Sequence, residues 1–215
     1  MPEDAIESSN LPHHGPGTSP LRNHRPPAED LPVLTTGSLF LRVREYTLAH
    51  HGPEGWSELL AALSPSDAHD VDHVLAIGHY DTLLLSRLYR ALEATAGHAD
   101  PQVLDRFGAW TAEQDLHTTQ RLFLRFASPA YVFEKTGAYW SRFHDAGQWA
   151  MTRHGSSAAT GVLTGFIACE TFCRTLVPYI RRILELGGTR GVHVDHPRCR
   201  GRSDADCAFH LRWRP

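Results

Sequence analysis

The segment RCRGRSDADCAFHLRW (Arg198–Trp213) indicates the fold class of this protein. Its second half alternates apolar and polar residues, and the stretch before it, RGVHVDHPRC, does the same, with Val192 and Val194 set against His193 and Asp195. Alternation with a period of two is typical of half-buried strands. The charged turn RGRSDAD joins the two runs, so the sequence predicts a C-terminal β-hairpin.

Upstream of the hairpin, apolar residues recur at helical spacing between glycine, proline and capping residues. We expect helices over residues 37–52, 53–64, 80–96, 100–127, 128–147 and 161–188. A strand is expected over residues 148–155, followed by a flexible loop, GSSAATG. The predicted class is α+β, with a helical layer packed on a small antiparallel sheet that ends in the hairpin.

The N-terminal residues 1–36 differ in composition from the rest. They hold half of the 14 prolines, and the stretch PHHGPGTSPLRNHRPP has neither helical nor strand periodicity. Such a segment has little apolar surface to bury. We therefore expect a disordered Pro/His-rich arm over 1–36 and a single domain over 37–215.

Composition restricts the classes of function. The net charge of −3 provides no general attraction to nucleic acid or to anionic lipid. The sequence begins without a signal-peptide pattern and contains no apolar run long enough to span a bilayer, so we expect a cytoplasmic protein with reduced thiols. No nucleophile elbow, phosphate loop or dinucleotide fingerprint is present, and binding is expected rather than catalysis.

The cysteines leave three interpretations open. Cys199 and Cys207 flank the turn of the hairpin, and Cys169 and Cys173 lie upstream, one helical turn apart. The hairpin pair could form a disulfide, bind a metal, or pack as small apolar side chains, which is the usual role of buried cysteine.

A resemblance to a known family rests on three segments: YWSRFHDAGQW (139–149), TGFIACETFC (164–173) and HVDHPRCRGRSDADCAFHLRW (193–213). They resemble the 4-vinyl-reductase-like small-molecule-binding domain and related uncharacterised proteins common in myxobacteria. The N-terminal half, through VREYTLAHHGPEGWSELLAAL (43–63) and LDRFGAW (104–110), is more weakly similar to the haem-nitric-oxide-binding domain of the same superfamily. The resemblance implies a sensory or regulatory module, often dimeric, with a pocket between helices and sheet.

The resemblance also implies a structural zinc site. Some relatives bind zinc through a cysteine, an acidic residue and two hairpin cysteines separated by seven residues, the separation of Cys199 and Cys207. His196 stands where those relatives have the acidic ligand, and histidine is an equally good zinc ligand. Cys173, or Cys169 one turn before it, would complete the set. The expected metal ligands are Cys173, His196, Cys199 and Cys207.

Haem is not expected from the sequence. The haem-binding relatives use a proximal histidine and a Tyr-x-Ser-x-Arg motif, of which WAMTR keeps only Arg153, and YWSR at 139–142 has the wrong spacing. His117 and His144 are the nearest candidates for the proximal ligand, and neither falls where the family has it.

Aromatic residues gather in the second half of the chain and would line the predicted pocket, unless they form an ordinary core. With a few polar groups they suit a flat apolar or aromatic ligand that carries an anionic group. The expected ligand-binding residues are Tyr139, Trp140, Phe143, His144, Trp149, Arg153 and Phe166.

The sequence thus predicts a homodimeric sensory module that binds a small hydrophobic or aromatic molecule, tetrapyrroles included, and signals through an unidentified protein partner. Two alternatives stay open. One is an interaction or scaffold protein whose cavity is filled. The other is a metalloenzyme that uses His69, His73 and His79, of which the first two are four residues apart and share a helix face.

Overall fold

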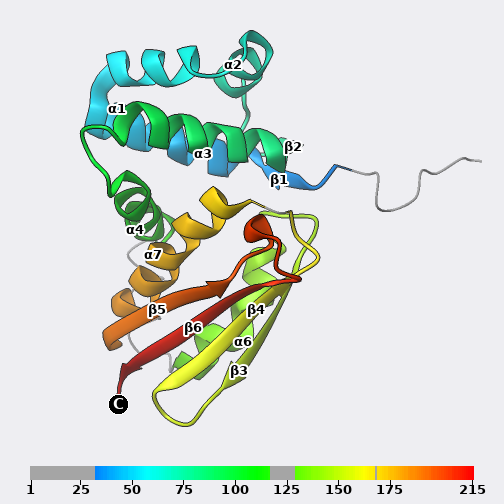
Figure 1. Ribbon diagram of the computed structural model, residues 1–215, viewed down its shortest axis with the longest axis vertical. Coiled ribbons are helices and arrows are strands. Elements are labelled where there is room, and N and C mark those ends of the chain that lie inside the picture. Colours follow the sequence, from blue (N-terminus) through cyan, green and yellow to red (C-terminus); the bar gives the residue numbers. More distant parts are fainter. Residues whose placement is uncertain (1–31, 117–128, 168) are drawn as a thin grey trace, which may run out of the picture. The chain divides into compact units, whose positions relative to one another are not determined.

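The predicted C-terminal hairpin is present, and it forms half of a four-stranded antiparallel sheet. The computed structural model describes residues 32–116, 129–167 and 169–215, and Figure 1 shows the strands of this sheet side by side. The strand order is β3–β4–β6–β5. The bounds are Gln148–Arg153 for β3, Ala158–Thr164 for β4, Arg190–Arg198 for β5 and Cys207–Arg214 for β6, and a short 3-10 helix, η2 (Arg200–Arg202), lies in the hairpin turn.

Helices make up most of the remaining described chain. They are α1 (Gly37–Ala61), α2 (Pro65–Asp72), α3 (Thr82–Ala96), α4 (Val103–Asp115), α6 (Pro129–Trp140) and α7 (Glu170–Leu186). The turn expected between the first two helices is a kink inside α1, where Gly52 leaves the helical conformation with a φ of 69°. Ser64 caps α2 by accepting from the Asp67 N–H, and Asp81 caps α3 by accepting from the Leu83 N–H.

Helices cover one face of the four-stranded sheet. Helix α6 contacts β3, and α7 contacts β5 and crosses α4 (Figure 1). Along β6 the residues alternate accordingly, with Phe209 and Leu211 buried and His210 and Arg212 exposed. The predicted α+β class, with a helical layer on a small antiparallel sheet and a C-terminal hairpin, is confirmed.

A second, two-stranded antiparallel sheet was not predicted. Strand β1 (Leu34–Thr36) pairs with β2 (His79–Asp81) just before the start of α1 and α3 respectively. The backbone N–H of Thr36 also donates to the carbonyl of Phe143, 2.8 Å away. The boundary expected at residue 36 therefore falls at the end of an ordered strand, and residues 32–36 belong with the compact unit that runs to residue 215. The rest of the expected arm, residues 1–31, lies outside the described residues.

The prediction for residues 155–165 was wrong. The loop GSSAATG and the first turns of the long expected helix are largely strand β4, and α7 begins only at Glu170. Short residues gave β4 a weak strand signal, but pairing with β3 and β6 on both sides supplies the hydrogen bonds. The expected helical residues 117–128 lie outside the described part.

In the part of the chain that the structure describes, no helix is both long and apolar enough to cross a membrane.

Candidate functional site

An apolar cavity of about 260 Å³ lies between α4, α6, α7 and the sheet. The helices contribute Phe107, Val132, Trp140 and Leu176, and the sheet contributes Leu211. Five of the predicted ligand-binding residues line it: Tyr139, Trp140, Phe143, His144 and Trp149.

Two predicted ligand-binding residues do not line the cavity. Arg153 ends β3, where its guanidinium donates to the carbonyl of Gly155. Phe166 lies behind the cavity wall and packs edge-to-face on Trp140 and His144, with ring centroids 4.8 and 4.9 Å apart. Neither the guanidinium of Arg153 nor the ring of Phe166 lines the cavity.

His144 follows the last turn of α6 and is buried beside the cavity. Its Nδ1 is hydrogen-bonded to the hydroxyl of Thr35 on β1, and its ring lies against Trp140. Its Nε2 makes no hydrogen bond with any described residue. Burial lowers the pKa of His144 to about 3, so the imidazole is neutral near pH 7.

A polar cluster interrupts the apolar lining. Asp115, the last residue of α4, accepts a hydrogen bond from Arg42 Nε on α1, 3.0 Å away. The hydroxyl of Tyr179 on α7 lies 3.1 Å from the other oxygen of Asp115 and 2.9 Å from the hydroxyl of Tyr139 on α6. Sequence reasoning missed Asp115 and Tyr179, because nothing in a lone carboxylate or tyrosine indicates that three helices meet there.

The second candidate site is the cysteine–histidine cluster: Cys173, His196, Cys199 and Cys207. One possible ligand atom from each lies within 4.8 Å of all the others. The four residues that the sequence predicted are therefore together. All four cysteines of the chain are buried and free, so no disulfide joins Cys199 to Cys207.

Hydrogen bonds within the cysteine–histidine cluster favour a thiolate at Cys207. The Cys173 thiol donates to Cys207 Sγ at 3.5 Å, and the backbone N–H of Arg200 donates to the same sulfur at 3.4 Å. The Cys173 thiol and His196 hold the pKa of Cys207 below its usual range, while the same pair interaction raises the pKa of Cys173. His196 stacks on Phe209, and its Nε2 is buried without a hydrogen-bond partner in the described structure.

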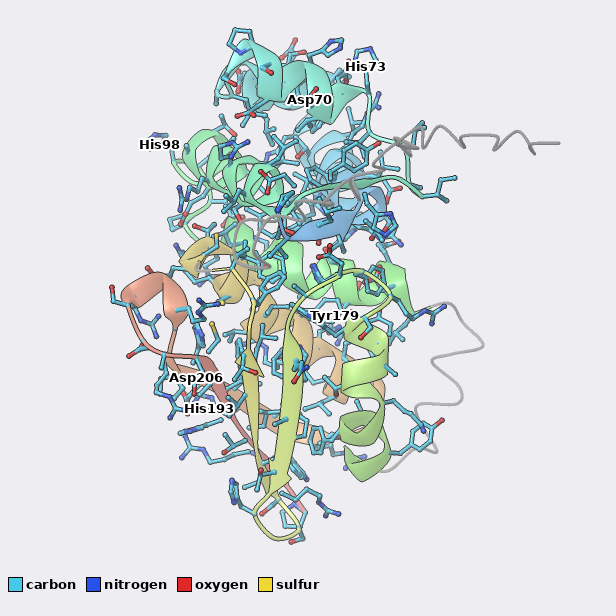
Figure 2. All side chains as sticks on the ribbon, turned by 90° about the vertical axis from the view of Figure 1, so that its right-hand side faces the viewer. Asp70, His73, His98, Tyr179, His193 and Asp206 are labelled. Carbon is cyan, nitrogen blue, oxygen red and sulfur yellow. The ribbon has the colours of Figure 1, made fainter. Side chains whose placement is uncertain are left out.

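The other histidines considered as metal ligands do not form a cluster of this kind. The rings of His69 and His73 lie 4.3 Å apart on α2, but no third ligand joins them among the described residues. Figure 2 shows His73 and Asp70 at the end of the molecule opposite the hairpin residues His193 and Asp206. His79 is exposed on β2, and His117 lies outside the described part.

Comparison with known proteins identifies the fold. No family model matches the chain, and no curated protein matches it. Among solved structures, the H-NOX protein of S. oneidensis in the Fe(II)NO state aligns with a TM-score of 0.63 at 12% identity, over 84% of this chain and 99% of that one. The unliganded Fe(II) H-NOX protein of K. algicida aligns with a TM-score of 0.60 at 10% identity, over 84% and 97%.

The chain has the H-NOX fold. The NMR structure of the Shewanella oneidensis H-NOX domain in the Fe(II)CO state agrees, with a TM-score of 0.56 at 13% identity over 83% and 98% of the two chains. The haem-nitric-oxide-binding part of the resemblance is thus confirmed at the level of fold, whereas the 4-vinyl-reductase-like part stays a prediction.

The expectation that haem can be set aside was wrong. The matched structures hold ferrous iron, and another was solved to probe haem distortion in the H-NOX family. The prediction rested on the missing Tyr-x-Ser-x-Arg spacing, whereas the fold aligns with these structures over 83–84% of this chain.

Proposed function

We propose that this domain is a small-molecule sensor that holds a planar, largely apolar ligand in the cavity and signals binding to a protein partner. The observation that carries the proposal is the cavity itself, with its apolar lining and few polar groups. Its position between helices and sheet, in a fold shared with haem-binding domains, supports it. The alternative of an interaction protein with a filled interior lacks this support.

Haem is the first ligand to consider, and His144 fits the role of iron ligand. A neutral imidazole with one nitrogen hydrogen-bonded and the other free is the form that binds a metal. Thr35 fixes the ring through Nδ1, Nε2 has no partner among the described residues, and burial keeps the imidazole uncharged. Haem would supply an iron centre that binds diatomic gases. The aromatic walls, Trp140 and Phe143 among them, would exclude water from it.

The test is a titration of the purified full-length protein with haemin under dithionite, followed by absorption. We expect a stoichiometric Soret band that His144→Ala weakens or shifts and that His98→Ala, an exposed control, leaves unchanged. Quenching of Trp140 and Trp149 fluorescence by 2-naphthol tests an organic ligand in the same cavity. If neither haemin nor 2-naphthol binds, the sensor proposal is wrong and the interaction-protein alternative is preferred.

We also propose that Cys173, His196, Cys199 and Cys207 bind one structural zinc ion. Zinc takes four sulfur and nitrogen ligands in a tetrahedron, and Zn–S bonds of about 2.3 Å set sulfurs about 3.8 Å apart. The 3.5 Å between Cys173 and Cys207 and the unpartnered His196 Nε2 support this set. Four protein ligands leave no open position, so the ion would join the start of α7 to the hairpin without catalysing a reaction.

Elemental mass spectrometry of protein purified without a His tag tests the zinc proposal. We expect one zinc per chain, lost in Cys199→Ser and Cys207→Ser and retained in Cys169→Ser, since Cys169 is buried but lies outside the four. Zinc absent from the wild type, or retained in every variant, would contradict the assignment.

The remaining expectations are proposals too. A homodimer, a cytoplasmic location and a protein partner follow from the resemblance and the composition, and light scattering of the purified chain measures the first of them. No catalytic residue is proposed.

A further inference from the structure

The polar cluster at the cavity consists of Arg42, Asp115, Tyr139 and Tyr179, and it indicates what kind of ligand group the cavity accepts. Tyr139 and Tyr179 both line the cavity, and Figure 2 shows Tyr179 in the interior beside the helices. The side chain of Asp115 is only 9% exposed. A buried carboxylate imposes a direction on the hydrogen bonds around it, because it only accepts them.

The donors and acceptors of the hydrogen bonds in this cluster can be assigned starting from Asp115. Arg42 Nε donates to one oxygen of Asp115, and the Tyr179 hydroxyl, 3.1 Å from the other oxygen, donates to that one. A tyrosine has a single hydroxyl proton, and that of Tyr139 is taken up either by the same Asp115 oxygen, 3.5 Å away, or by the Tyr179 oxygen, 2.9 Å away. Tyr139 therefore has no proton left for a ligand, and its oxygen keeps a free lone pair.

Tyr139 also stays uncharged. Burial, followed by the charge of Asp115, raises the pKa of Tyr139 to about 12. Its oxygen is thus a neutral acceptor near pH 7, and a phenolate does not form there.

The threonine hydroxyls that line the cavity offer no donor either. Thr111 donates to the carbonyl of Phe107, Thr136 to that of Val132, and Thr175 to that of Phe172. The ammonium of Lys135 lies over the ring of Tyr131, one turn towards the start of α6 and away from Tyr139. The indole N–H of Trp149 is buried without a hydrogen-bond partner among the described residues, and its ring packs on Trp140 and Phe209.

We infer that an organic ligand of this cavity, as distinct from haem, presents an uncharged hydrogen-bond donor, a hydroxyl or an N–H, to the oxygen of Tyr139, and that a carboxylate is rejected at this end of the cavity. The inference rests on the proposed function, because it assumes that the cavity takes a planar ligand. It replaces the expectation of an anionic ligand, since Asp115 already supplies a buried negative charge and an anion would find acceptors opposite it.

Three probes of matched shape test the inference by calorimetric titration of the full chain: 2-naphthol, 2-methoxynaphthalene and 2-naphthoate. We expect 2-naphthol to bind at least about tenfold more tightly than 2-methoxynaphthalene, which lacks the donor, and 2-naphthoate to bind most weakly. Equal affinity of 2-naphthol and 2-methoxynaphthalene, or tighter binding of 2-naphthoate, would overturn the inference and leave the proposed function standing. Failure of all three probes while haemin still binds would overturn the inference and leave haem as the ligand, whereas failure of the three probes and of haemin would count against the proposed function itself.

Variants test whether the preference for 2-naphthol over 2-methoxynaphthalene depends on the polar cluster. Tyr139→Phe removes only the acceptor, so the preference for 2-naphthol over 2-methoxynaphthalene should disappear. Tyr80→Phe is the matched control, because the hydroxyl of Tyr80 accepts from the Leu75 N–H and lies outside the cavity lining. Asp115→Asn is a second route if Tyr139→Phe fails to fold. Arg42 holds the oxygen of the new amide, so its N–H can donate to a tyrosine oxygen, which frees a tyrosine proton for the ligand and should reduce the same preference. A preference unchanged in both variants would remove the cluster from the binding site.

Discussion

At the scale of single residues, His144 is a titratable side chain held in an apolar environment. Its imidazole is enclosed by Trp140, Phe166 and Phe172, and its one polar contact among the described residues is the hydroxyl of Thr35. The aromatic enclosure cannot solvate a charge, which is why burial holds the pKa of His144 at about 3.

The pKa of His144 predicts that the folded protein loses stability in mild acid. In the unfolded chain His144 binds a proton below pH 6.5, whereas the folded chain resists that proton down to about pH 3. Its contribution is therefore fully present above pH 6.5 and is lost as the pH falls. Between pH 7.5 and 5 the free energy of unfolding should drop by about 2 kcal/mol through this residue.

Urea unfolding of the ligand-free protein at several pH values measures this loss. His144→Gln should remove about that part of the pH dependence, while His98→Gln, which changes an exposed histidine, should keep it. The same pH dependence in wild type and His144→Gln would mean that another group causes the acid sensitivity.

At the scale of elements, the crossing of α4 and α7 forms the base of the cavity. Gly108 on α4 faces α7, where a Cβ would lie 2.3 Å from the carbonyl oxygen of Thr175 and 2.7 Å from Pro178. The missing side chain lets the two helices approach closely enough for Phe107 and Thr111 to line the same cavity as Leu176.

This close approach predicts that Gly108→Ala destabilises the fold. The added methyl group meets backbone, so the helices must separate, and we expect a loss of about 2 kcal/mol in the free energy of unfolding. Gly137→Ala on α6 is the matched control. Its Cβ would meet no atom within 4 Å, so the better helix propensity of alanine should stabilise the protein by about 1 kcal/mol. Equal effects of the two substitutions in denaturant unfolding would contradict this account of the crossing.

At the scale of the whole described domain, α7 connects the two candidate sites. Cys173 belongs to the cysteine–histidine cluster, while Phe172, Leu176 and Tyr179 on the same helix line the cavity. An ion pair reinforces the link, since Arg202 in the hairpin turn lies 3.2 Å from Glu170 at the start of α7. The proposed zinc ion would thus fix the helix that forms one wall of the cavity.

Removal of zinc should therefore lower the stability of the domain, most of all in the hairpin and at the start of α7. We expect a chelator to lower the melting temperature by about 5 °C or more, because metal binding contributes to folding. Hydrogen exchange should accelerate in β5, β6 and the first turns of α7 and stay unchanged in α1 and α3. Cys199→Ser, already without the metal, should not respond to the chelator. A response in that variant, or none in zinc-loaded wild type, would contradict the proposal.

Much of this protein could be predicted from local sequence. Alternation around Val192 and Leu211 predicted the hairpin, and helical periodicity over residues 80–96 predicted the helix observed as α3, because these signals depend on neighbours in the chain. The four proposed zinc ligands followed from the resemblance to zinc-binding relatives, whose two hairpin cysteines have the separation of Cys199 and Cys207, and the four residues do lie together.

The tertiary structure alone decided the rest. Strand β4 depends on partners on both sides, Thr35 reaches His144 across 109 positions of sequence, and Asp115 meets Tyr179 across 64. Burial, hydrogen-bond direction and pKa arise from groups that only the fold brings together, and no local pattern encodes them. For that reason the sequence by itself determined most of the helices and the C-terminal hairpin, while strand β4, the two-stranded sheet, the cavity, its neutral histidine and its acceptor end were determined by packing.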